Sequence, residues 1–356
     1  MRLSIAHRVL LAVTSGLSVY GVTARAQVTV TGVGYVQYGY SLKADSGLVA
    51  TTGSAGHDNN FDVSRSYVNV LGKLAGGVQT RITIDVDGRK AAANQLSFRL
   101  KYAFVGWTPP TSALTYKMGL FTTPWMDFEE AIWDYRMQGP IAFDRNGLFP
   151  SSDFGLGADG TWNGDQVNMQ VGVFDGEGYS NAPGDPGKDV EGRLSVRLAK
   201  TDLAGRVGGV RLNGYGQVGR ATGGGSRSRF IGNLSYKSKT VTLVAEYLMG
   251  QDSTGAATPK QKAGVLSAYG VFNIPNSKAA LIARLDTYDP NTDSASTAKN
   301  ATGANKQTRV IAGISYQIAP NLRVLGDVDL NSLQNGSTNS FDKSRQMFLF
   351  QTQFTF

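Results

Sequence analysis

Arginine and lysine side chains recur at every second position in several segments of this chain, on the face that carries the polar residues. Such side chains recognise anions. A guanidinium group binds carboxylate or phosphate oxygens in pairs and is weakly hydrated, so a wall of such groups attracts anions and passes them along. Acidic residues of the same parity are fewer, and they include Asp85, Glu246 and Asp327. The basic residues assigned to this wall are Arg65, Arg81, Arg99, Lys101, Lys117, Arg193, Arg197, Arg211, Arg309 and Arg323.

Other chemistry is poorly supported by the sequence. His57 is the only histidine after residue 26, and its neighbour Asp58 does not make it an oriented general base. Gly214-Tyr-Gly-Gln-Val-Gly219 matches a dinucleotide fingerprint, yet it lies inside an alternating segment with no helix after it. Asp327-Val-Asp-Leu-Asn331 begins like a calcium loop but lacks the glycine and the distal glutamate. With no cysteine in the chain, we expect no enzyme, cofactor or metal site.

The last thirteen residues, from Ser344 to Phe356, indicate the element that carries the basic groups. Read with period two, one face holds Phe348, Phe350 and Phe354, while the other ends in amides and a hydroxyl. A strand with one lipid-facing and one water-facing side is typical of a membrane β-barrel. A terminal phenylalanine also resembles the signal read by the barrel-assembly machinery, so Phe356 is assigned that role.

The same alternation recurs through the chain and predicts sixteen strands. Short turns alternate with longer links rich in Gly, Ser, Asn and Asp, as periplasmic turns and extracellular loops do, and a soluble sandwich has no reason to keep this parity. The prediction is an all-β fold, a transmembrane antiparallel β-barrel formed by residues 27–356. The segments are 28–42, 61–74, 77–87, 97–108, 114–124, 153–162, 166–175, 188–199, 206–220, 227–237, 241–252, 262–274, 278–289, 306–319, 322–333 and 344–356.

The first 26 residues have the features of a cleaved signal peptide. Arg2 and Arg8 precede an apolar run, and Ala24-Arg-Ala26 supplies the cleavage pattern. Without this segment 32 basic residues face 27 acidic ones, a net charge of +5. These charges are spread along the chain, whereas a nucleic-acid binder would cluster them. We therefore expect a protein of the bacterial outer membrane, in contact with its lipid.

One long link, from Trp125 to Ser152, is unusually apolar and is called the inserted loop below. Water-exposed loops are seldom so aromatic, and ordered long loops are usually functional. We expect it to fold into the barrel as a constriction, the alternative being a surface cap or a subunit contact. Its acids would then face the basic groups of the second to fifth strands and set up a transverse field. The residues assigned to the constriction are Trp125, Asp127, Glu129, Glu130, Trp133, Asp134, Arg136 and Arg145.

Three motifs and the terminal phenylalanine give the chain a family resemblance. They are Arg65-Ser-Tyr-Val-Asn-Val-Leu-Gly, Leu100-Lys-Tyr-Ala-Phe-Val105 and Met118-Gly-Leu-Phe-Thr-Thr-Pro124. With these the chain resembles the phosphate-selective porin O and P family. The resemblance implies sixteen strands, a homotrimer and an arginine-lined path for phosphate, in which Arg65, Arg81 and Arg99 would take part. The inserted loop departs from the family in having no lysine and four acids before residue 135.

The expected function is a passive diffusion channel for small hydrophilic solutes that prefers anions, phosphate among them. Basic residues in a lumen are the usual device of anion pores, because the walls lie within about a Debye length, ~8 Å, of a permeating ion. Two alternatives stay open: a non-selective or weakly cation-selective porin, and a structural or adhesive barrel without an open pore.

Overall fold

The computed structural model describes residues 27–45, 59–87, 96–181, 184, 186–221, 224–253, 255, 258, 260–293, 306–334 and 341–356. The signal peptide expected at residues 1–26 and the histidine at position 57 lie outside the described residues. None of the helices in the described ranges is long and apolar enough to cross a membrane.

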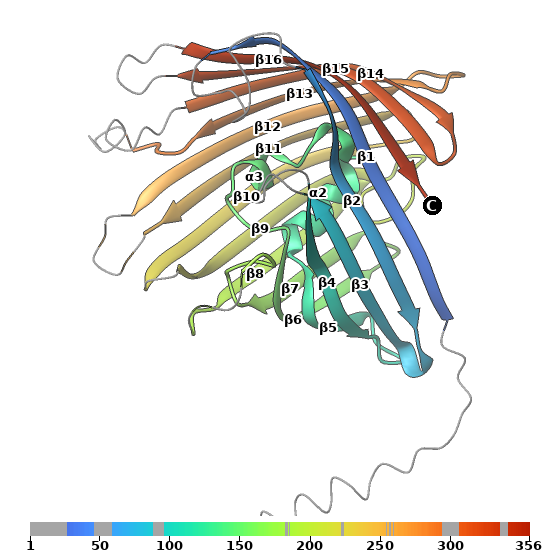
Figure 1. Ribbon diagram of the computed structural model, residues 1–356. Coiled ribbons are helices and arrows are strands. Elements are labelled where there is room, and N and C mark those ends of the chain that lie inside the picture. The colour runs from blue at the N-terminus through green and yellow to red at the C-terminus, as the bar shows by residue number, and fades with distance from the viewer. Residues whose placement is uncertain are drawn as a thin grey trace, which may run out of the picture.

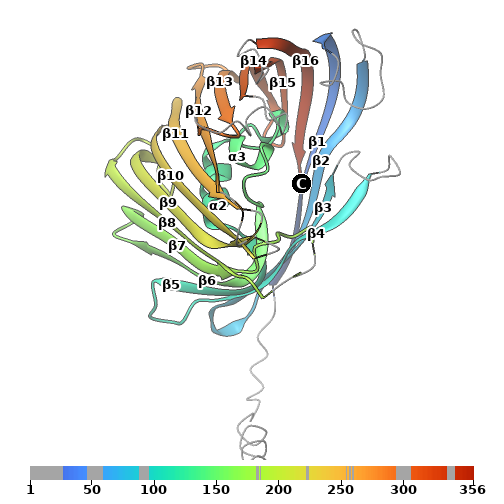
Figure 2. The ribbon, with the colours of Figure 1, turned by 90° about the vertical axis from the view of Figure 1, so that its left-hand side faces the viewer.

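Sixteen antiparallel strands close into one barrel, which confirms the predicted fold (Figures 1 and 2). Each strand pairs with its neighbours in sequence, and the first pairs with the last. The strands are β1 (Gln27–Ala44), β2 (Asn59–Lys73), β3 (Val78–Asp87), β4 (Ser97–Trp107), β5 (Leu114–Thr122), β6 (Ser152–Trp162), β7 (Val167–Phe174), β8 (Asp189–Ala199), β9 (Gly209–Ala221), β10 (Gly225–Lys237), β11 (Val241–Asp252), β12 (Gln261–Asn273), β13 (Ala279–Asp289), β14 (Lys306–Ala319), β15 (Leu322–Gln334) and β16 (Phe341–Thr355).

The end of the chain completes the ring. The backbone N–H of Gly32 donates to the carbonyl of Phe356 at 2.8 Å, and the N–H of Phe356 donates back to Gly32 at 3.1 Å. Thr355 stands opposite Val33 in the β1–β16 register. Closure removes the free edges that an open sheet would present to lipid.

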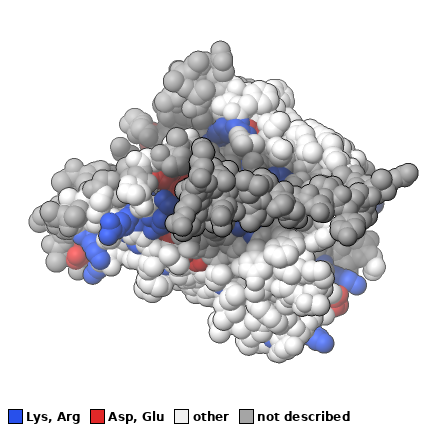
Figure 3. Space-filling view, turned by 90° about the horizontal axis from the view of Figure 1, so that it is seen from below, with Lys and Arg blue, Asp and Glu red and all other residues white. Residues whose placement is uncertain are grey.

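Alternate side chains point to opposite faces of this wall, as the sequence pattern requires. Phe98, Met118 and Ile314 are 75%, 63% and 61% exposed on the outer face, while inward residues such as Ser267 and Asn213 are buried. A broad uncharged expanse of wall is visible from below, with Lys and Arg gathered toward the left and right of the picture (Figure 3). An apolar band of this kind suits the hydrocarbon core of a bilayer, and the fold is that of a bacterial outer-membrane barrel.

Among the described pairings, β4 and β5 share the fewest paired residues. Between β4 and β5 the register runs only from Ala103 to Trp107, so the outer half of β4 has no β5 partner in the described pairings. The β3–β4 register shifts between Thr83 and Ile84, which leaves Lys101 as an extra residue in β4. Because β5 stops at Thr122, the chain leaves the wall well below its rim and turns inward.

Candidate functional site: the barrel interior

The inserted loop contains three short helices that the strand pattern did not predict. They are α2 (Pro124–Ile132), η2 (Arg136–Gln138) and α3 (Ala142–Arg145). A proline at the first position of α2 is suited to a helix start, since that position needs no backbone donor. Figure 2 shows α2 and α3 enclosed by the ring of strands.

Aromatic contacts attach the inserted loop to the far wall. The ring of Trp125 lies 6.0 Å from that of Tyr215 on β9, and the ring of Trp133 lies 4.9 Å from that of Tyr269 on β12. Both tryptophans are fully buried. Buried aromatic side chains of this size dominate packing energies, and here they form the core of the lumen.

Polar anchors fix the same loop from several strands. Lys237 Nζ on β10 donates to the carbonyl of Ile132 at 2.8 Å, and Arg193 Nε on β8 donates to the carbonyl of Pro124 at 3.0 Å. Gln351 Nε2 on β16 donates to the carbonyl of Met137 at 2.8 Å. The loop therefore lies inside the barrel, and the alternative of a surface cap is wrong.

The acids of the inserted loop do not face the basic wall as a group. Asp127 pairs with Arg206 in the β8–β9 turn, and Asp134 pairs with Lys237 at 3.0 Å. Burial alone would raise the pKa of Asp127, but the ion pair with Arg206 outweighs it and lowers that pKa. Asp127 and Asp134 are thus each paired with a cation that holds the loop.

Glu130 lies beside the basic residues of β2 to β5, and Asp127 also interacts with Lys117 there. It pairs with Arg136 of the same loop and lies 4.0 Å from Lys101 Nζ. Burial would raise the pKa of Glu130, and these cations lower it instead. The loop thus spans the lumen from β8 to β4.

Arg65, Arg81, Arg99, Lys101 and Lys117 form a connected group on β2 to β5, called the basic arc. Arg65 binds Asp85 through two bonds of 3.1 and 2.9 Å, and Arg99 shares the same carboxylate at 3.4 Å. Lys117 pairs with Asp159. The arc therefore holds more cations than acids.

Neutral groups also hold two members of the basic arc, one of which, Lys101, lies near Glu130 as well. Arg81 Nη2 donates to Asn69 Oδ1 at 2.8 Å and its guanidinium lies 4.3 Å from the centre of the Tyr102 ring. Lys101 Nζ donates to the hydroxyl of Tyr67 at 3.2 Å. Rings and hydroxyls orient a cation without cancelling its charge.

Several other basic residues assigned to the wall serve the fold. Arg211 donates to the carbonyls of Asp165 and Gly208, and Arg197 donates to that of Gly164, so both hold short turns. A guanidinium group has several N–H donors and can therefore bind the backbone carbonyls of a turn. The alternation of residues along a strand does not reveal this role. The remaining two are placed as follows: Arg309 pairs with Asp329, and Arg323 stacks 5.0 Å from the ring of Tyr135.

Sequence reasoning missed a cavity of about 620 Å³ that opens between the inserted loop and the β7–β8 link. Arg227 of β10 shares the parity of Arg229 and could have been found from that alternation. The contribution of the β7–β8 link could not have been found in this way, because Tyr179 and Ser180 are far in sequence from the residues of β2 and β4 to which they bond. The charged residues that line the cavity are Arg65, Arg99, Arg145, Arg227, Arg229, Asp144, Glu177 and Asp252.

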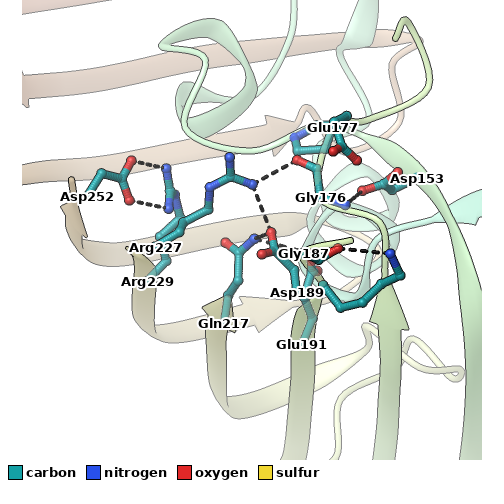
Figure 4. A network of polar contacts seen from close by, with 12 residues as sticks. Asp153, Gly176, Glu177, Gly187, Asp189, Glu191, Gln217, Arg227, Arg229 and Asp252 are labelled. Atoms are coloured by element: carbon teal, nitrogen blue, oxygen red, sulfur yellow. Dashed lines mark hydrogen bonds and ion pairs between the residues drawn. The ribbon is translucent and has the colours of Figure 1, made fainter. Parts of the chain in front are cut away.

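The acids that hold these arginines mostly lie behind them. Asp189, which accepts from Arg227 at 2.8 Å, is only 1% exposed in its side chain, and Asp85 is not exposed at all. Asp252 differs, since its side chain is 43% exposed and accepts two bonds from Arg229. Figure 4 shows Arg227 beside Asp189 and Arg229 beside Asp252. Because a guanidinium has five donors and a carboxylate takes two, donors remain for the cavity.

The comparisons with known proteins agree with this architecture. No protein-family model and no curated protein matches the chain. The structure is similar to the outer membrane channel DcaP of Acinetobacter baumannii, with 10% identity, a TM-score of 0.66 and coverage of 93% of this chain and 97% of that one. It is also similar to OprB of Pseudomonas putida, with 11% identity, a TM-score of 0.63 and coverage of 93% and 94%. A third similar structure is OmpT, an outer-membrane protein of Vibrio cholerae, with 13% identity, a TM-score of 0.62 and coverage of 93% and 98%. These likenesses show the outer-membrane barrel fold.

Proposed function

We propose that this protein is a passive diffusion channel of the outer membrane that prefers small anionic solutes, phosphate among them. The observation that carries the proposal is the cavity of about 620 Å³, whose lining has five arginines and three acids. Since Asp85 and Asp189 lie behind the cavity surface, the face met by a solute is more positive than the wall as a whole. A concave site of one sign concentrates counter-ions.

The basic arc continues this surface toward the short-turn end. Arg65 and Arg99 belong to both the cavity and the arc, while Lys101, Arg81 and Lys117 follow along β3 to β5. Neighbouring strands are only ~5 Å apart, so an anion would pass between adjacent cations in short steps.

A salt-gradient reversal potential tests the preference. Replacing Arg99 and Lys101 with Gln should lower the anion-to-cation permeability ratio by about twofold or more, because lumen charges are weakly screened. The matched change at Lys43 and Lys262, which are exposed near the outer ends of β1 and β12, should do much less. Equal shifts from both pairs would contradict a filter in the arc, and no conductance at all would favour a structural barrel.

The proposed assembly is the homotrimer implied by the resemblance. The short pairing of β4 with β5 supports it, because the outer half of β4, from Ser97 to Tyr102, has no β5 partner in the described pairings. Lipid cannot satisfy an open sheet edge, whereas a second copy can cover it. Native mass spectrometry of detergent-extracted protein tests this, and a monomer there would contradict it.

A further inference from the structure

Two buried carboxyl groups meet where the inserted loop rests on the barrel wall. Glu129 of α2 is not exposed and Glu246 of β11 is 2% exposed. Trp125 Nε1 donates to Glu129 Oε2 at 2.8 Å, and Asn233 Nδ2 donates to Glu246 Oε2 at 2.9 Å. Within the described residues, the Oε1 atom of each has no hydrogen-bond donor.

The two carboxyl groups face each other closely enough to form a hydrogen bond. Ionised carboxylates are acceptors only, so two of them cannot bond without a proton between them. Like charges this close in a buried site disfavour double ionisation, and one member keeps its proton.

Arg284, the cation that acts on both glutamates, is bonded to a third acid. Arg284 Nε donates to both oxygens of Asp286 at 2.9 Å, and Arg145 Nη1 donates to Asp286 Oδ2 at 2.9 Å. Among the described residues, neither glutamate of the pair forms an ion pair of its own. Of the remaining neighbours, Tyr269 is a neutral phenol and Asp134 of the loop is paired with Lys237.

We propose that Glu129 and Glu246 share one proton that fastens the inserted loop to the barrel wall, and that a rise in pH releases the loop. This would make the pair a pH-sensitive latch inside the lumen. The inference does not depend on the anion preference proposed above.

The direction of the pH effect follows from which state binds the proton. Burial, and then the facing Glu246, raise the pKa of Glu129 well above its ordinary value of 4.5. The seated loop therefore holds a proton that the released loop gives up. Seating is strongest below the ordinary pKa, and it weakens as pH rises through the range up to the raised one, by at most tenfold per pH unit.

Single-channel currents recorded at successive pH values test the latch. In the wild type, a released loop should move within the lumen and interrupt the current. These channel closures should become more frequent as pH rises, by up to tenfold per pH unit. Glu129→Gln supplies an amide N–H in place of the proton and cannot titrate, so its closures should not depend on pH. Glu246→Gln, made on the wall, should act in the same way.

Asp202→Asn is the control, since the Asp202 carboxylate accepts from the backbone N–H of Lys239 between two short turns and not from the inserted loop. Its pH dependence should match the wild type. A pH dependence that persists in both latch variants, or that is absent from the wild type, overturns the proposal.

Infrared titration of the wild-type protein adds a test that needs neither a variant nor a conducting channel. A carboxylic-acid band should disappear over the same pH range in which the inserted loop becomes sensitive to protease. If the loop is released while all such bands persist, no proton of the pair is involved.

Discussion

Asp85 shows how a single buried carboxylate organises the basic arc. It holds Arg65 at 2.9 Å and Arg99 at 3.4 Å, and the hydroxyl of Tyr179 also lies 3.3 Å from it. Each guanidinium is thereby kept in place. The acid has a structural role and also reduces the positive charge that a permeating anion would meet.

Asp85→Asn should therefore raise the preference for anions and lower the stability of the barrel. The anion-to-cation permeability ratio should rise, because one negative charge leaves the arc. Stability should fall by about 3–5 kcal/mol, the usual cost of breaking a buried ion pair. Reversal potentials and urea unfolding of the folded barrel measure the two effects. A ratio that falls would show that Asp85 acts only by holding its arginines.

Lys237 offers a second prediction at this scale. Its Nζ donates to the carbonyls of Ala131 and Ile132 and pairs with Asp134, so it fastens the end of α2. Lys237→Met should loosen the inserted loop at a cost of about 1–3 kcal/mol, seen as faster quenching of tryptophan fluorescence. Lys239→Met, two residues on in the β10–β11 turn, should leave quenching unchanged; the idea fails if both variants behave alike.

At the scale of elements, the strands were predictable and their attachments were not. The predicted segment 241–252 coincides with β11, and 306–319 with β14, because alternation and turn residues are local signals. The anchors of the inserted loop join residues far apart in the sequence, from 69 positions for Arg193 and Pro124 to 214 for Gln351 and Met137, and no local pattern encodes such pairs. Lys101 was predicted to point inward, and it does so only because it is the extra residue of a β-bulge.

The seam between β1 and β16 carries a prediction of its own. The ring of Phe356 lies over Gly32, where an added Cβ would stand 2.2 Å from a ring carbon, whereas a Cβ at Gly214 would meet nothing within 4 Å. Gly32→Ala should displace the ring and reduce the heat-modifiable, folded fraction on gels. Gly214→Ala, also outward on a strand, should not.

Deletion of Phe356 should impair assembly more strongly than Gly32→Ala, because it also removes the backbone pair with Gly32. Normal levels of inserted barrel in the deletion would contradict an assembly role for this residue.

At the scale of the molecule, the barrel wall does not depend on the inserted loop for its strand pairing. All sixteen strand pairings are made without the inserted loop. Replacing residues 126–149 with a short Gly-Ser linker should leave the far-ultraviolet circular dichroism dominated by strand and raise single-channel conductance severalfold, since the lumen loses its packed core. Unchanged conductance would show that solutes do not pass beside the loop.

The distant anchors of the inserted loop also set an order of events during folding. Tyr135 bonds to Ser315, 180 residues later, and the carbonyl of Met137 bonds to Gln351, 214 residues later. Such contacts are costly to form before the intervening chain is placed. These two bonds can therefore form only as the last strands join the first, whereas the partners of Trp125 and Trp133 on β9 and β12 are in place earlier. Anchoring of Tyr135 and Met137 marks the moment at which the barrel becomes complete.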